Sequence, residues 1–106
     1  MTGVIQQMLT IIEQTYGVSL DQHSVNVGRF ITHLRYLFVR IHQGKQLDKG
    51  PEPIIASIRQ SYPKAMQCAQ TIGTVASLRL GSNLTEDEVA YLALHVARVV
   101  ADARKP

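Results

Sequence analysis

Four histidines carry the most varied chemistry in this chain, because near neutral pH an imidazole can exchange a proton, bind a metal or accept a phosphoryl group. They stand at positions 23, 33, 42 and 95. Two imidazoles that share a metal on one helix face need a spacing of four residues, and no pair has that spacing. The sequence therefore favours neither a metal site nor a metal cofactor, and we expect no other cofactor.

His33 has the neighbours that phosphoryl chemistry requires. Arg29 and Arg40 lie on its side of a predicted helix, which places the imidazole between two guanidinium groups. Like-charge repulsion lowers the basicity of an imidazole, so more of it stays neutral at pH 7. Neutral imidazole is the nucleophilic form, and arginines can hold a phosphoryl group through paired hydrogen bonds.

His95 has a comparable setting near the end of the chain. With Glu88, Tyr91 and Arg98 it is expected to form the polar, solvated border of the last helix. The simpler interpretation of His33 and His95 is a half-buried polar residue on a helix flank, and periodicity alone leaves both open. If the two imidazoles lie close across one groove, their titrations are coupled. The other two histidines lie at helix ends, where capping or exposure is the simpler expectation.

Five helices must position these residues. Hydrophobic residues that recur every three or four positions predict helices at about 4–16, 24–43, 53–60, 62–80 and 86–102. Gly17, Gly44 and Gly81 are their expected stops, and the polar stretch 44–51 predicts a loop. Thr85 and Glu88 have the spacing of a capping box at the start of the last helix. No segment predicts a strand, so we expect residues 1–106 to form one all-α, compact five-helix bundle.

Composition excludes several classes of protein. The chain has 106 residues, of which 45% are hydrophobic and 18% charged, the balance of a packed domain. A single cysteine, Cys68, excludes an intramolecular disulfide and a cysteine-based zinc finger, and its neighbours suggest a small buried residue. The longest apolar run, from Val89 to Leu94, is six residues, against the roughly 20 of a membrane span. With no leader-like segment at the start, we expect a cytoplasmic domain without membrane insertion.

Three segments together resemble a known family. Residues 29–37 read RFITHLRYL and are followed by Arg40, residues 61–69 read SYPKAMQCA, and residues 88–99 read EVAYLALHVARV. In this order they are similar to the motifs of the phosphotransferase-system regulation domain (PRD) of BglG/LicT-family transcriptional antiterminators. The resemblance covers about Val4 to Val100. Thr32 stands where the first-copy version of the domain has Asp, which indicates the second-copy type.

The resemblance implies a regulatory and dimerisation module of a transcriptional antiterminator or regulator, and not an enzyme. It implies a five-helix homodimer with two phosphorylatable histidines, which map onto His33 and His95. The donors would be phospho-HPr and the IIB component of a sugar permease. Arg40 and Arg98 match motif positions, and with Arg29 they are candidates to support the phosphate. RNA contact would need a separate domain that these residues do not contain.

Two alternatives remain at the level of sequence. A net charge of +3 and an isoelectric point near 9.3 suggest a small basic helical nucleic-acid-binding protein. Against it, Arg29 and Arg40 are eleven residues apart, and with Arg35 off to one side they form no continuous basic stripe. A histidine phosphotransfer intermediate is the other alternative, and it differs only in whether phosphate leaves quickly to another protein.

Overall fold

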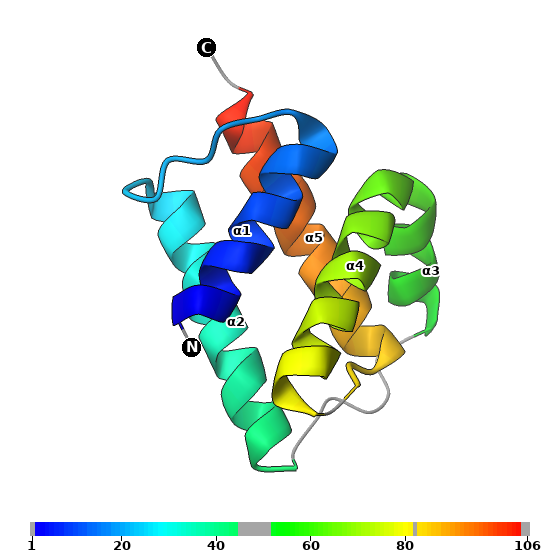
Figure 1. Ribbon diagram of the computed structural model, residues 1–106. Helices are drawn as coiled ribbons and strands as arrows, with labels where there is room; N and C mark the ends of the chain where they lie inside the picture. The colour runs from blue at the N-terminus through cyan, green and yellow to red at the C-terminus, as the bar shows by residue number, and fades with distance from the viewer. Residues whose placement is uncertain (1, 45–51, 82, 105–106) are drawn as a thin grey trace.

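The structure is built from helices alone. The computed structural model describes residues 2–44, 52–81 and 83–104, and within these ranges it contains five helices and no strand (Figure 1). The expectation of an all-α bundle is therefore confirmed. Each helix begins and ends within two residues of its expected range, and the expected loop at 44–51 lies outside the described residues except for Gly44. The helices are α1 (Thr2–Tyr16), α2 (Val25–His42), α3 (Glu52–Ser61), α4 (Pro63–Leu80) and α5 (Glu86–Ala103).

Short polar signals fix where the helices begin and end. Ser24 caps α2 by accepting a hydrogen bond from the amide of Val27, which satisfies one of the free amides of the first turn. At α5 the full capping box forms, with Thr85 and Glu88 each accepting a hydrogen bond from the other's backbone amide. Gly81 ends α4 with φ 73°, a left-handed conformation that any side chain would strain.

Helix α5 lies at the centre of the bundle. It packs against each of the other four helices, with α2 and α3 on opposite sides of it (Figure 1). Because α5 is covered from several directions, small side chains dominate its buried surface: Ala90, Ala93 and Val96 have no exposed area. The same holds for Ala69 and Ala76 on α4, and small facing side chains let two helices approach closely at the packing density of a protein interior.

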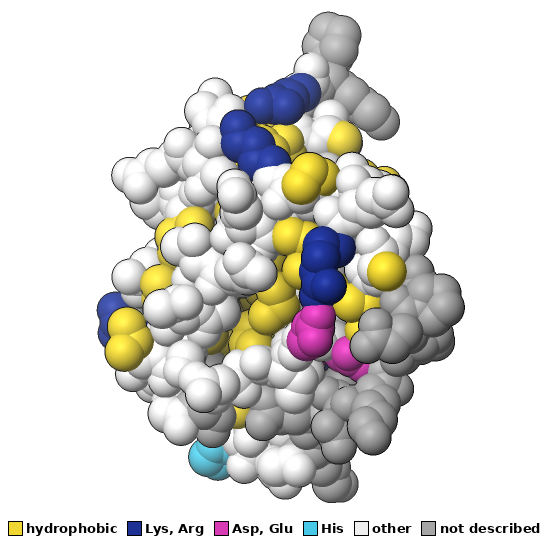
Figure 2. Space-filling model, turned by 90° about the vertical axis from the view of Figure 1, so that its right-hand side faces the viewer, with side chains coloured by type: hydrophobic (Ala, Val, Ile, Leu, Met, Phe, Trp, Pro, Cys, Tyr) yellow, Lys and Arg dark blue, Asp and Glu magenta, His cyan; other side chains and the backbone are white. Residues whose placement is uncertain are grey.

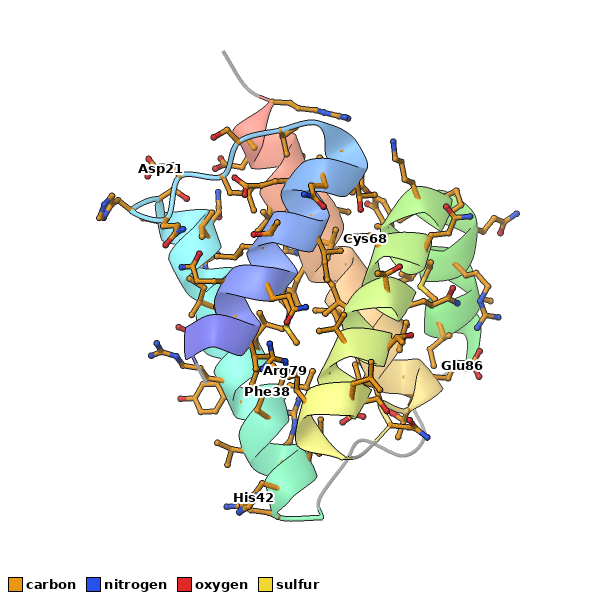
Figure 3. All side chains as sticks on the ribbon, in the orientation of Figure 1. Asp21, Phe38, His42, Cys68, Arg79 and Glu86 are labelled. Carbon is orange, nitrogen blue, oxygen red and sulfur yellow. The ribbon has the colours of Figure 1, made fainter. Side chains whose placement is uncertain are left out.

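The core is apolar and continuous through all five helices. Phe38 points from α2 into the interior, and Cys68 does so from α4 (Figure 3). Cys68 is 2% exposed, which confirms its interpretation as a small buried residue, and burial raises the pKa of its thiol. In the part of the chain that is described, no helix has the length and hydrophobicity of a membrane span. The residues with the least exposure include Met8, Leu9, Ile12, Phe30, Leu34, Ile72 and Val96.

Removal of the α5 cap tests how far this helix supports the bundle. Thr85→Ala deletes the hydroxyl that accepts from the Glu88 amide, and we expect a loss of about 1 kcal/mol in the free energy of unfolding. The measurement is urea unfolding followed by circular dichroism. Thr71→Ala is the matched control, since its exposed hydroxyl bonds only to a carbonyl one turn earlier in α4 and should change stability by less than about 0.5 kcal/mol. Equal effects of the two variants would contradict a capping role.

Candidate functional site

Helices α2 and α5 bring two histidines into direct contact. The ring centroids of His33 and His95 lie 4.1 Å apart, with an angle of 27° between the ring planes, so the imidazoles are stacked. They are separated by 62 positions in the chain, and only the packing of α2 on α5 joins them. Across residues 2–44, 52–81 and 83–104, no three His, Cys, Asp or Glu side chains gather as ligands for a metal.

The apolar stripe of α2 decides where His33 points. Phe30 and Leu34 are each 1% exposed, and they turn one face of α2 into the core. His33 directly precedes Leu34, so it lies at the border of that face and remains exposed to solvent. One of the two rings is therefore accessible to a partner protein.

Helix α5 holds its histidine more deeply. Leu92, Val96 and Val99 face the core, and His95 lies on the flank of this stripe, where the α2 packing leaves it half-buried. The stack therefore pairs an exposed imidazole from α2 with a half-buried imidazole from α5.

A small cavity of about 50 Å³ adjoins the pair. This space has room for a group the size of a few water molecules. Side chains of α2 and α5 form all of its walls, so the packing of these two helices creates it. Its apolar walls are Phe30, Leu34, Leu37 and Leu92, and its polar walls are His33, Arg40, Glu88, Tyr91 and His95.

Arg40, which lines the cavity, carries a buried donor without a partner. Its Nε atom is buried, and within the described residues no acceptor bonds to it. A buried donor without a partner costs free energy, and more so when the group is charged. Such a group in a native protein is explained by water, an ion or a ligand that completes its hydrogen bonding.

The surroundings of His95 keep its imidazole neutral. Its pKa is lowered from 6.5 to about 4, first because burial disfavours the imidazolium, and then because His33 and Arg98 add positive charge nearby. At pH 7 the ring therefore has an unprotonated nitrogen available. The neighbouring groups on α5 are Glu88, Tyr91 and Arg98, and those on α2 are His33 and Arg40.

The structure brings some of the expected site residues together and leaves others apart. His33, His95 and Arg40 line one cavity, and Arg98 influences His95 electrostatically. Arg29 is exposed on α2 and does not line that cavity. His23 and His42 are exposed, as expected for helix ends, and His42 lies at the far end of α2 (Figure 3).

Glu88 differs from its expected place on a solvated border. It is 2% exposed and forms part of the cavity wall. Its Oε1 accepts a hydrogen bond of 2.8 Å from the amide of Thr85, so the capping box itself draws the carboxylate inward. The sequence predicted that bond. It did not predict the burial, because α2 supplies the neighbouring surface.

Comparison with known proteins identifies the family of the chain. The model of the PRD domain family matches residues 6–99, a range that contains both stacked histidines and all three expected arginines. The chain belongs to the PRD domain family.

Two of the relatives of this PRD domain are antiterminators by name. The domain is 28% identical over 102 residues to the transcription antiterminator LicT of Bacillus subtilis, covering 96% of the chain and 37% of that protein. It is 30% identical over 93 residues to the protein GlcT of Staphylococcus epidermidis, covering 88% and 33%. It is 25% identical over 104 residues to a beta-glucoside operon antiterminator of Dickeya chrysanthemi, covering 98% and 37%. The chain thus spans about a third of the length of these curated relatives.

The shifted pKa of His95 makes this PRD domain sensitive to acid. The pKa lies near 4 in the folded domain and at 6.5 in the unfolded chain, so between these pH values the unfolded chain binds more protons. The free energy of unfolding is therefore highest, as far as His95 is concerned, above pH 6.5, and it decreases as the pH falls toward 4. The change is about 1–2 kcal/mol once solvent screening of the half-buried ring is allowed for.

Urea unfolding at several pH values measures this effect, and NMR titration of the ring protons gives the midpoint directly. His95→Gln should flatten the fall in stability between pH 6.5 and 4. His42→Gln, which removes an imidazole outside the cavity, should retain it. A His95 midpoint at 6 or above would show that the ring is not desolvated as the packing requires.

Proposed function

We propose that this PRD domain is a regulatory module of a transcription antiterminator or related regulator, controlled by phosphorylation of His33 and His95. The observation that carries the proposal is the stacked pair beside a cavity that Arg40 also lines. The names of the relatives supply the regulatory context, since LicT and the beta-glucoside operon protein are antiterminators.

The chemistry of acceptance is a nucleophilic attack by a neutral imidazole. An unprotonated ring nitrogen forms a bond to phosphorus while the bond between phosphorus and the donor's nitrogen or sulfur breaks, and the electron pair of that bond leaves with the donor. The lowered pKa of His95 keeps its nitrogen unprotonated at pH 7. His33 has the advantage of exposure, so a protein donor reaches it without opening the α2–α5 interface.

Arg40 is the residue best placed to stabilise a phosphohistidine. Arg40 lines the cavity together with both histidines, and its guanidinium would offer paired donors to phosphoryl oxygens there. Arg98 adds positive charge near His95. Arg29, exposed one turn before His33, would serve the approach of an anionic donor surface rather than the cavity.

The donors in this proposal are those that the family resemblance implies. They are the phosphocarrier HPr in its phosphorylated form and the IIB component of a sugar permease. Both would act on the domain in the cytoplasm, and the domain would hold the phosphoryl group as a signal rather than turn over a substrate. RNA contact would belong to a separate domain of the regulator.

The proposed output is a change in pairing between two copies of the domain. Tyr36 and Val39 are large hydrophobic side chains on α2, three and six residues after His33. They are 63% and 48% exposed. Such surface favours a partner over water. Phosphorylation would add a charge of about −1.5 to −2 beside it, which changes the electrostatics of a homodimer at this face.

Phosphate transfer in a reconstituted system tests the proposal. The chain is incubated with phosphoenolpyruvate, enzyme I and HPr, with and without a IIB protein, and its intact mass is measured before and after acid treatment. We expect an acid-labile increase of one or two phosphoryl groups. His33→Ala and His95→Ala should each lower incorporation, and the double variant should abolish it, whereas His42→Ala should label like the original chain.

Circular dichroism of each variant separates loss of an acceptor from loss of the fold. Full labelling of the double variant would refute the assignment of His33 and His95. Absence of label on the folded original chain with every active donor would refute phosphorylation as the control, and the two histidines would then be structural residues of a helix interface.

A further inference from the structure

A second pocket lies at the other end of the bundle, away from the histidine pair. Its volume is about 280 Å³, near the lower end of the sizes typical for small-molecule sites. Three segments form it: the end of α1, the junction between α3 and α4, and the last two turns of α5. The residues that line it are Tyr16, Ser61, Tyr62, Pro63, Lys64, Ala65, Ala97, Val100, Ala101 and Arg104.

Two cations converge on one aromatic ring in this pocket. The Nζ atom of Lys64 lies 5.0 Å from the ring centroid of Tyr16, and the Cζ atom of Arg104 lies 5.4 Å from the same centroid. Both distances are within the range of cation–π attraction. Lys64 comes from the start of α4 and Arg104 from the end of α5, so the fold assembles the two charges from distant parts of the chain.

No carboxylate neutralises these two charges. Aspartate and glutamate are absent from the lining, and among the described residues neither Lys64 nor Arg104 forms an ion pair. The first turn of α4 contains no acidic residue either. At the end of the molecule that carries the C-terminus, basic side chains gather around hydrophobic surface, and the acidic side chains visible on that face lie well below them (Figure 2).

The contacts that hold the cations leave their charge available. Arg104 donates a hydrogen bond of 3.3 Å from Nη2 to the backbone carbonyl of Tyr16, which anchors the side chain at the end of α1. The ring of Tyr16 attracts both cations without neutralising them. Both charges are therefore held near one ring in the lining of a concave site, and a dianion bound there would be attracted to both of them.

We propose that this pocket binds a small phosphomonoester, with its phosphate between Lys64 and Arg104. The guanidinium offers paired donors to phosphate oxygens, and the ammonium adds a compact point charge. The hydroxyls of Ser61 and Tyr62 offer polar contacts to the rest of the ligand. Ala97, Val100 and Ala101 form the apolar wall of the pocket. A phosphomonoester carries nearly two negative charges at pH 7 and matches two cations better than a monocarboxylate does.

The proposed site is independent of the histidine pair. The two pockets share no lining residue, so the phosphomonoester would be bound and not transferred, and no bond of the ligand breaks. The proposal does not depend on whether His33 or His95 is phosphorylated. Its test therefore needs no phosphoryl donor.

Titration of the full chain with three probes tests the site. Ribose 5-phosphate, inorganic phosphate and ribose are added separately, and amide and side-chain chemical shifts are followed by NMR. We expect ribose 5-phosphate and phosphate to shift signals of Tyr16, Tyr62 and Ala65, and ribose to shift none. Tighter binding of ribose 5-phosphate than of phosphate would assign the organic part to the pocket, whereas shifts confined to His33 and His95 would overturn the proposal.

Single charge removals make the test specific. Lys64→Gln and Arg104→Gln should each weaken ribose 5-phosphate binding about tenfold or more, the loss expected for a hydrogen bond to a charged group. Arg79→Gln is the matched control, because it removes the same charge from the same helix as Lys64, about 22 Å further along α4. It should bind like the original chain.

Thermal unfolding with and without ligand separates binding from a purely structural role. The original chain and Arg79→Gln should gain melting temperature with ribose 5-phosphate, and Lys64→Gln should lose most of that gain while remaining folded. Equal weakening by all three variants would show non-specific attraction to net charge and refute the site. Absence of binding to the original chain at millimolar ribose 5-phosphate would refute it as well.

Discussion

The burial of α5 by four neighbouring helices is the constraint on which the rest of the structure depends. A helix covered from so many directions can carry few large side chains on its contacting faces, and Ala90, Ala93 and Val96 meet that condition without any exposed area. Ala69 and Ala76 of α4, the helix packed against α5, likewise have no exposed area. In a close-packed interior these positions tolerate little change in volume, so α5 has one position relative to α2 and its side chains are held in fixed relation to those of α2.

That fixed relation sets the chemistry of the histidine pair. His95 loses basicity because α2 removes water from one side of it and because His33 and Arg98 lie near. The same packing buries the Nε of Arg40 without an acceptor and places Glu88 in the cavity wall, where its carboxylate also caps α5. A buried donor without an acceptor and a half-buried imidazole held neutral both oppose stability locally, and departures of this kind are expected where a protein has a function.

The two pockets use different parts of the central helix. The cavity beside the histidine pair uses residues 88 to 95 of α5, and the pocket with Lys64 and Arg104 lies at its last turns, together with the end of α1 and the start of α4. The first relies on desolvation of a titratable group, whereas the second relies on positive charges held by an aromatic ring and a carbonyl. Each belongs to a separate patch of surface, so chemistry at one does not require the other to change.

The sequence by itself determined the helices, the glycine that ends α4, the capping box of α5 and which residues were candidates for the site. Periodic apolar residues, the glycine at position 81 and the Thr85–Glu88 capping box are local signals, because helix formation depends on neighbours within a few residues. His33 and His95 were recognisable from their neighbours and from family motifs. Only the tertiary structure decided that their rings stack, that Glu88 is buried and that Arg29 stays outside the cavity. It also decided that Lys64 and Arg104 meet at the ring of Tyr16. These features join residues far apart in the chain, and contact, burial and pKa depend on surfaces that the other helices supply.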